Sequence, residues 1–417
     1  MTLTTSSTSR RARLSNLAAA AALSVGLGYG AAAEATPLTL DMSTTAGFAQ
    51  TCKQLPHDAR RLKNDDERIA WALCRDTDQT RRLITWATQN FTRIDHTPLP
   101  QVVAEVERQI DEVRREMAQT RQVLARINLG ERHSLQIAPG QWQMDLNGDG
   151  QMALWEKYFF AIPKRGLSHA SWGLPRNDEA HIQRNYAPAA QIRIDQADVL
   201  WALSYHQFIE GLLTHVRAFD LDTKHWHLTL ARPALLGQAH TLIGQGLETS
   251  DRMRHAVLAE TDDEQEWIAN PQQRQSVFPL VLDAEDFNTW REVMAEARAT
   301  WQGEHLLPAS RNARGLLGEF APLCAEGQGL NVKQLYRKPP TKTLRIGSSG
   351  PLPDVSDTRA SAAPCPPRTM PTCSGSSWPP AKAGTTPCPR ATACCGWPLN
   401  AAACKWRARP CATNWPC

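Results

Sequence analysis

The chain has 417 residues, 42% of them hydrophobic and 21% charged, with a formal net charge of +4. This composition is typical of a soluble protein with two or three domains, and the charge is too small for this length to indicate a nucleic-acid partner. The 14 tryptophans are scattered along the chain, so they do not form an array on which bases would stack.

Residues 1–33 have the features of a signal peptide. The start is basic, with Arg10 and Arg11, and residues 16–33 are uncharged and rich in Ala, Leu and Gly. The small residues before Glu34 suit cleavage by signal peptidase, so we expect a mature protein that is periplasmic or secreted. The arginine pair also resembles the start of a twin-arginine signal, and a disordered Ala-rich N-terminus is the alternative.

Residues 34–130 form an N-terminal region that is expected to be helical. Within residues 46–93, apolar residues recur at helical spacing, which predicts a series of short helices. Cys52 and Cys74 fall in this stretch. In an oxidising compartment they could form a disulfide that joins two of the helices, and two buried thiols are the alternative.

One long helix is expected at residues 99–127. Thr97 can cap it, and Pro98 or Pro100 suits its first turn. Its apolar residues alternate at spacings of three and four, and they are Val103, Val106, Ile110, Val113, Met117, Leu124 and Ile127. This apolar seam, broken only at Thr120, predicts packing on the preceding helices or a coiled coil with another chain.

The segment Asp145–Glu156 fits the pattern D-x-[DN]-x-[DN]-G-x5-E at every defined position. It therefore resembles the calcium-binding loop of the EF-hand family, over about 20 residues of the chain. The resemblance implies a Ca²⁺ site whose ligands are Asp145, Asn147, Asp149, Gln151 and Glu156. The spacing has a chemical reason, because Ca²⁺ takes six to eight oxygen ligands and a tight loop of alternating acceptors can surround it.

Each loop position has an expected task. Gly150 permits the sharp bend, and Gln151 offers its backbone carbonyl. Ala153 has no side-chain oxygen, so a water is expected at that position. Glu156 closes the shell with both carboxylate oxygens from the first turn of a helix at 154–162.

The segment before the loop departs from the EF-hand pattern. Pro139 and Gly140 interrupt it, so a strand or a short helical turn is expected where an EF-hand has a long helix. A calcium-triggered opening of two helices is therefore disfavoured. Residues 191–198 resemble a degenerate second half without an ion, in which Ile194 would pair with Met152. The alternative is a helix start with Asp195 as its N-cap, and both can hold together.

Residues 131–345 are expected to form a helical domain that includes the loop. Its other helices are predicted at 195–217, 233–259, 286–303 and 311–320. Alternating strands are nearly absent, so the fold class is mainly α. We expect a helical, bundle-like body with a short irregular or β segment that carries the loop.

Two further groups of residues carry side chains that can bind a metal ion. His225-Trp226-His227 is predicted to be a pair of surface histidines, and a zinc site is the alternative. The acidic run at residues 260–266 is predicted to be a solvated helix end, with a second cation patch as the alternative. No G-x-S-x-G, P-loop, dinucleotide or H-E-x-x-H motif occurs, so no catalytic or cofactor residues are assigned.

The tail, residues 346–417, differs in composition from the rest. Residues 358–417 contain no Asp, Glu, Ile, Val, Phe or Tyr and hold eight of the 11 cysteines. Such a segment has little with which to form a core. A frameshifted C-terminus is expected, with a disordered tail and a disulfide-rich module as alternatives.

These features predict an exported calcium-binding protein of the EF-hand type, in which calcium has a structural role. No other segment approaches the roughly 18 apolar residues of a spanning helix, so the mature chain is expected to have no stable membrane span. One alternative is an interaction or scaffold protein that binds a protein partner through the helix at 99–127. Another is a periplasmic hydrolase with a structural calcium.

Overall fold

The computed structural model describes residues 40–91, 93, 96–167, 178–261, 265–274, 276–308, 329–339 and 344–345. The predicted signal peptide, the helix expected at 311–320 and the tail from residue 346 lie outside these residues. The described part of the chain is mainly α-helical, as the sequence predicts. None of its helices is both long and apolar enough to cross a membrane.

The helices are α2 (Thr45–Gln54), η1 (Ala59–Arg61), α3 (Asp65–Phe91), α4 (Leu99–Leu124), η3 (Pro139–Gln141), α5 (Leu154–Lys157), α6 (Glu179–Asn185), α7 (Gln196–Val216), α8 (Pro233–Ala259), α9 (Ala284–Gln302) and α11 (Val332–Arg337). The strands are β1 (Gln136–Ile137), β2 (Ile162–Pro163), β3 (Tyr186–Ala187), β4 (Ile192–Arg193), β5 (Phe219–Asp222), β6 (His227–Leu230), β7 (Leu307–Pro308), β8 (Gly329–Leu330) and β9 (Leu344–Arg345). β5, β6 and β9 form a three-stranded antiparallel sheet, and the remaining strands form antiparallel pairs, β1 with β4, β2 with β3 and β7 with β8.

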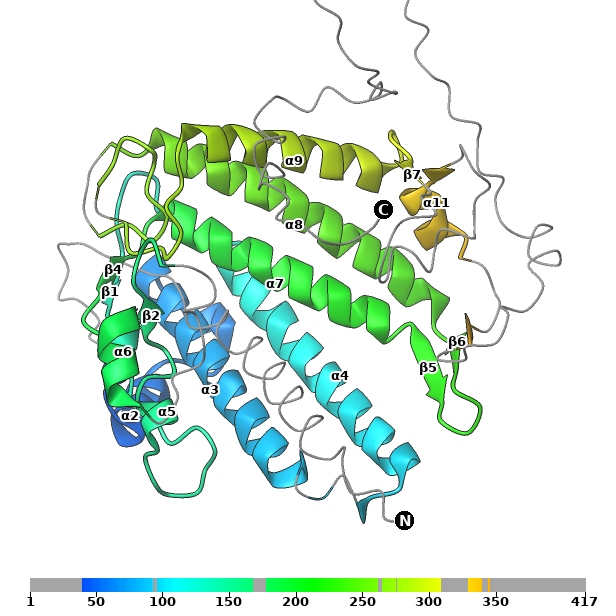
Figure 1. Cartoon of the computed structure of the whole chain (residues 1–417), viewed down its shortest axis with the longest axis horizontal. Coiled ribbons are helices and arrows are strands. Elements are labelled where there is room, and N and C mark those ends of the chain that lie inside the picture. Colours follow the sequence, from blue (N-terminus) through cyan, green and yellow to red (C-terminus); the bar gives the residue numbers. More distant parts are fainter. Residues whose placement is uncertain are drawn as a thin grey trace, which may run out of the picture. The chain divides into compact units, whose positions relative to one another are not determined.

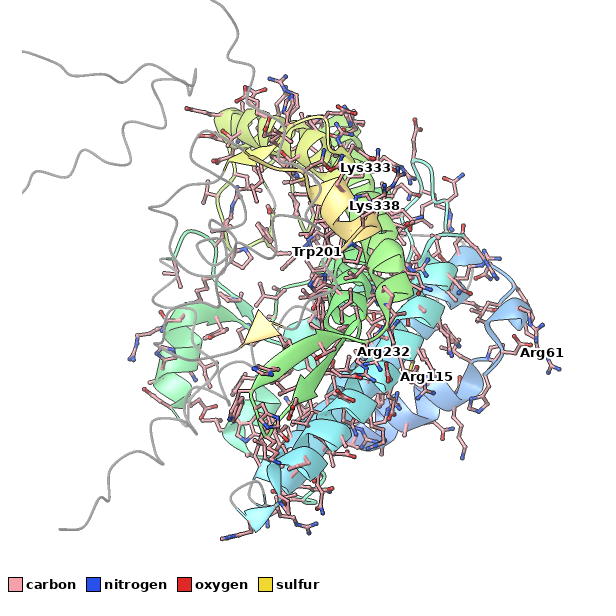
Figure 2. All side chains as sticks on the ribbon, turned by 90° about the vertical axis from the view of Figure 1, so that its right-hand side faces the viewer. Arg61, Arg115, Trp201, Arg232, Lys333 and Lys338 are labelled. Atoms are coloured by element: carbon pink, nitrogen blue, oxygen red, sulfur yellow. A yellow bond between two sulfur atoms is a disulfide. The ribbon has the colours of Figure 1, made fainter. Side chains whose placement is uncertain are left out.

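The long helices lie side by side in the order α3, α4, α7, α8 and α9 (Figure 1). α7 occupies the centre of this row because apolar residues surround most of its circumference, and such a helix is stable only when neighbours cover it. Charged side chains cover the outer faces, as Arg61 of η1 and Arg115 of α4 illustrate in Figure 2.

α3 is one continuous helix, so the prediction of only short helices at residues 46–93 is wrong in this part. No Gly or Pro interrupts the sequence between Asp65 and Phe91. Three acidic residues in the first turn, Asp65, Asp66 and Glu67, complement the positive end of the helix dipole. The break that the sequence does contain, at Pro56, falls after α2.

α4 packs against α3 and α7 of the same chain, which was the first of the two arrangements predicted for its apolar seam. Ion pairs join α4 to α3, including Arg82 with Glu112 at 2.9 Å. Thr120, which interrupts the seam, is fully buried. It is one of several buried polar side chains on the helices that pack together here.

A set of buried polar side chains lies on α3, α4 and α7. Its members include Asp76, Thr77, Gln79, Thr80, Thr120, His206, Gln207 and Glu210. The ring of His206 lies between two acceptors, with Nε2 3.1 Å from Asp76 Oδ1 and Nδ1 2.7 Å from the Ala202 carbonyl oxygen. Both ring nitrogens can donate only in the protonated imidazole, so this geometry favours the charged form.

α7 and α8 approach each other closely at two glycines. A methyl group on Gly211 would lie 2.7 Å from Ile243 Cγ1, and one on Gly246 would lie 2.8 Å from Phe208 Cε1. Both distances are shorter than a van der Waals contact. We define Gly211, Gly246 and the two side chains that fill them, Ile243 and Phe208, as the glycine notch.

A disulfide joins Cys52 of α2 to Cys74 of α3, so the first of the two alternatives for these cysteines holds in the structure. The cysteines are separated by 22 residues, and a cross-link over such a loop restricts the unfolded chain. Replacing both by Ala is expected to lower the free energy of unfolding by about 3 kcal/mol. Urea unfolding of the double variant and of reduced wild-type protein measures this, and stabilities equal to that of the oxidised wild type would contradict it.

Candidate metal centre

The segment before the loop at residues 145–156 is a short strand and one helical turn, as the sequence predicts. β1 is followed by η3, which begins at Pro139. β1 pairs with β4 in antiparallel register, with Ile137 opposite Ile192. No long helix leads into the loop.

The loop is held by side chains that accept hydrogen bonds from its own backbone. Asp145 accepts from Gly148 N through Oδ1 at 2.7 Å and from Gly150 N through Oδ2 at 2.9 Å. Asn147 and Asp149 each accept from the amide two residues further on, both at 2.8 Å. These bonds form successive Asx turns, which curl the chain tightly.

Glu156 joins the two ends of the loop. Its carboxylate is fully buried. Oε1 accepts from Leu146 N at 2.8 Å and from Asn147 N at 3.1 Å, while Oε2 accepts from Ala153 N at 2.9 Å. The last of these bonds also caps α5, whose first residues leave their amide groups without partners inside the helix. Glu156 therefore fixes both the loop closure and the start of the helix.

The backbone at Gly150 has a φ of +80°, a left-handed conformation that a side chain would disfavour. The pattern requires a glycine at this position, and the conformation supplies the reason. The α5 helix that follows is only four residues long, so the helix predicted over 154–162 is too long. Tyr158 already leaves the helical conformation, and Pro163 lies in β2.

The loop is attached to two helices of the body. Asp145 N donates to Thr45 Oγ1 of α2 at 2.9 Å, and Thr85 Oγ1 of α3 donates to the Leu146 carbonyl oxygen at 2.9 Å. Met144 and Leu146 are fully buried in the main hydrophobic core. Any ligand that stiffens the loop would therefore also stiffen its connection to α2 and α3.

The predicted ligand residues thus share one loop, with carboxylate and amide oxygens of the kind that hard cations prefer. Asp145, Asn147 and Glu156 turn these oxygens towards the backbone amides of the loop. Gln151 is exposed, and its predicted contribution is its carbonyl oxygen. Met152 is 44% exposed.

Residues 191–198 do not pair with the loop. The backbone of Ile194 bonds to that of Leu135 and Ser134, so the predicted pairing of Ile194 with Met152 is not formed. Asp195 is the N-cap of α7 and accepts from Asp198 N at 2.7 Å. The helix-start alternative is therefore the one that the structure supports.

A second group of acidic side chains lies away from the loop. Asp195, Glu260 and Glu266 each place one carboxylate oxygen within 4.8 Å of the others. Among the residues that the structure describes, this is the one group of three or more His, Cys, Asp or Glu side chains with such spacing. The carboxylates of the loop at residues 145–156 do not form a group of this kind. We call these three residues, together with the adjacent Asp198, the acidic cluster.

The solvated helix end predicted for residues 260–266 is wrong for its two described acidic residues. Glu266 is 1% exposed and Glu260 is half-buried, while residues 262–264 lie outside the described part. Trp267 and Ile268 follow Glu266 and are buried in the main hydrophobic core, so Glu266 beside them is also removed from solvent. That apolar pair was the available sequence signal.

His225 and His227 remain exposed or partly exposed, as predicted. His225 Nδ1 lies 2.7 Å from Asp222 Oδ2, within the turn that joins β5 to β6. The two rings are stacked with centroids 6.1 Å apart. Within the described residues, they are not part of a group spaced to share a metal ion.

Compared with protein-family models, curated proteins and solved structures, the chain matches none of them.

Proposed function

We propose that this is an exported calcium-binding protein, in which the loop at residues 145–156 holds Ca²⁺ in the manner of an EF-hand and the ion has a structural role. The observation that carries the proposal is the agreement between the ligand pattern and the local backbone. The side chains at loop positions 1, 3 and 5 form successive turns, and a left-handed glycine follows them. This curl is what a wrapped cation requires.

Calcium would replace the backbone amides as the partner of the loop carboxylates. Asp145, Asp149 and Glu156 bring three negative charges into one short segment, and a divalent ion would offset most of their repulsion. Because the same segment bonds to Thr45 and Thr85, the bound ion would fix the loop against α2 and α3. Without a long helix before the loop, stiffening is favoured over a switch between two helix arrangements.

Export is supported by two independent features. The N-terminal 33 residues have the composition of a signal peptide. The Cys52–Cys74 disulfide is of a kind that persists in oxidising compartments and is rare in the cytosol. Extracellular calcium modules bind with dissociation constants on the order of 10⁻⁴–10⁻³ M, which suits such a location.

Terbium luminescence tests the loop directly. Trp155 lies inside the loop and Trp142 is buried just before it, so Tb³⁺ bound there should show tryptophan-sensitised emission that calcium displaces. The double variant Asp145→Asn with Asp149→Asn should lose the part of this emission that Trp155 sensitises, because two ligand charges are removed. Trp155→Phe should weaken the emission and leave calcium affinity unchanged.

Calcium should also raise the free energy of unfolding, by about 2.7 kcal/mol when free calcium is about 100 times the dissociation constant. The same double variant should lose the part of this gain that comes from the loop. Asp178→Asn, an exposed helix cap elsewhere in the chain, is the matched control and should respond as wild type does. A double variant that keeps the full wild-type emission and the full stabilisation would refute calcium binding by the loop.

A further inference from the structure

The acidic cluster lies where three segments of the chain meet. Asp195 follows β4 and caps α7, and Asp198 lies one turn further along that helix. Glu260 directly follows α8. Glu266 lies in the returning segment, where Gln265 O accepts from Arg193 N of β4 at 3.3 Å. The acidic groups therefore come from parts of the chain that are separated by up to about 70 residues.

The cluster is buried. Asp195, Asp198 and Glu266 are 7%, 3% and 1% exposed. Fully buried Ile194 and Trp267 adjoin it in sequence, and Trp267 packs edge-on against Trp201 of α7, which is labelled in Figure 2. Carboxylates in such surroundings are costly to ionise unless a positive charge accompanies them.

Within the described part of the chain, three members of the acidic cluster have no positively charged side chain as an ion-pair partner. No Lys, Arg or His in the described part forms an ion pair with Asp195, Asp198 or Glu260. The positive end of the α7 dipole offsets part of the negative charge, since Asp195 and Asp198 lie at the N-terminus of this helix. That partial charge is about half of one unit, which is too small for the three carboxyl groups that have no ion-pair partner.

The Asp198 side chain is independent support for a positive charge bound at the acidic cluster. Its Oδ2 atom is buried and has no hydrogen-bond partner. Burial raises the pKa of Asp198 well above its usual range, and the negative charges of Asp195 and Glu266 raise it further. The second oxygen of Glu260, Oε2, is also buried without a hydrogen-bond partner. Glu260 contributes an oxygen to the group within 4.8 Å, and the Asp198 carboxylate lies near enough for the charges of Asp195 and Glu266 to act on it.

We infer that the acidic cluster is a second divalent-cation site, separate from the loop at residues 145–156, and that its ion is calcium. Oxygens bound to one Ca²⁺ at about 2.3–2.6 Å can lie up to about 5 Å apart, which accommodates the spacing of 4.8 Å. Mg²⁺ requires oxygens at about 2.0–2.1 Å and retains most of its waters, so a buried cage of carboxylates suits it poorly. The ion links the start of α7, the end of α8 and the segment around Glu266.

Calcium stoichiometry in the whole, disulfide-bonded chain tests this site. Equilibrium dialysis of chelator-treated protein should find two calcium ions per chain. Asp198→Asn and Glu260→Gln should each remove one of them and leave the terbium emission of Trp155 in place. The matched control is Asp283→Asn, which changes the N-cap of α9 but lies on the surface, and it should keep both ions.

The loop variant Asp145→Asn with Asp149→Asn separates this inference from the proposed function. It should lose the other ion and keep the one in the cluster. A single ion that only the loop variant removes would overturn the second site, and a single ion that only the cluster variants remove would overturn the loop.

Melting in chelator gives the last readout. Each cluster variant replaces one carboxyl group of a crowded acidic cluster by a neutral amide of similar shape. Without calcium it should therefore melt no lower than wild type, while its gain on adding calcium should be smaller. A variant that melts lower in chelator but gains as much from calcium as wild type would assign the cluster a purely structural role, in which the carboxyl groups share protons. Glu260 is half-buried, so Glu260→Gln keeps the test decisive if Asp198→Asn does not fold.

Discussion

Replacing Glu156 by Ala is expected to lower the free energy of unfolding by about 4 kcal/mol, even in the absence of calcium. The carboxylate accepts three backbone hydrogen bonds, from Leu146, Asn147 and Ala153. Each buried donor left without an acceptor costs about 1–3 kcal/mol. Urea unfolding in the presence of a chelator measures the effect without any contribution from the ion.

Two further variants locate the cause. Asp149→Ala removes an exposed carboxylate of the same loop, which accepts a single backbone bond, and should cost less than about 1 kcal/mol in chelator. Glu156→Gln keeps the shape but loses one accepting oxygen, so its effect should lie between the other two. If Glu156→Ala were as stable as Asp149→Ala, the carboxylate would not be closing the loop.

Replacing Asp76 by Ala is expected to lower the free energy of unfolding by about 3–5 kcal/mol at pH 6. Removing one partner of a buried ion pair leaves the other charge without compensation. Here that charge is His206, whose side chain is 3% exposed, and its remaining contact is the Ala202 carbonyl. Thermal or urea unfolding of the variant measures this loss.

The same pair should make stability depend on pH. Burial alone would lower the pKa of His206, but the charge and hydrogen bond of Asp76, the Ala202 carbonyl and the charge of Glu210 raise it above its usual value. Glu210 is itself paired with Arg121 of α4 at 2.6 Å. A raised pKa in the folded state stabilises fully below the unfolded value of about 6.5, and this stabilisation is lost as pH rises through the folded pKa.

Asp76→Asn should flatten this pH dependence, because it removes the negative charge and keeps the shape. Wild-type stability should therefore fall between about pH 6.5 and the higher folded pKa, while the stability of the variant should change less over that interval. A variant with the same pH profile as wild type would show that Asp76 does not hold the proton on His206.

Sequence patterns correctly predicted the elements whose structure depends on residues close together in the chain. The helix predicted at residues 233–259 has the bounds of α8, Pro233–Ala259. Pro139 correctly indicated that no long helix precedes the loop. The Asx turns at Asn147 and Asp149 and the bonds of Asp145 are also local, because each side chain bonds to backbone within five residues of itself.

The features that escaped prediction depend on segments that are distant in sequence. Thr120 interrupts an apolar seam, and only the packing of α4 against α3 and α7 removes it from solvent. Asp195 and Glu266 stand about 70 residues apart, so no spacing rule would have joined them. A carboxylate next to polar residues is usually solvated, and the fold reverses that expectation by burying Trp267 beside it.

The glycine notch also sets the rotation of α8 about its own axis. Phe208 fills the space above Gly246, and Ile243 fills the space above Gly211, so rolling the helix would drive a side chain into the opposite backbone. About 14 residues, or about 21 Å of helix, separate Gly246 from Glu260. The rotation of α8, which an apolar contact about four turns away fixes, thus sets the direction from which the chain brings Glu260 to the other acidic residues.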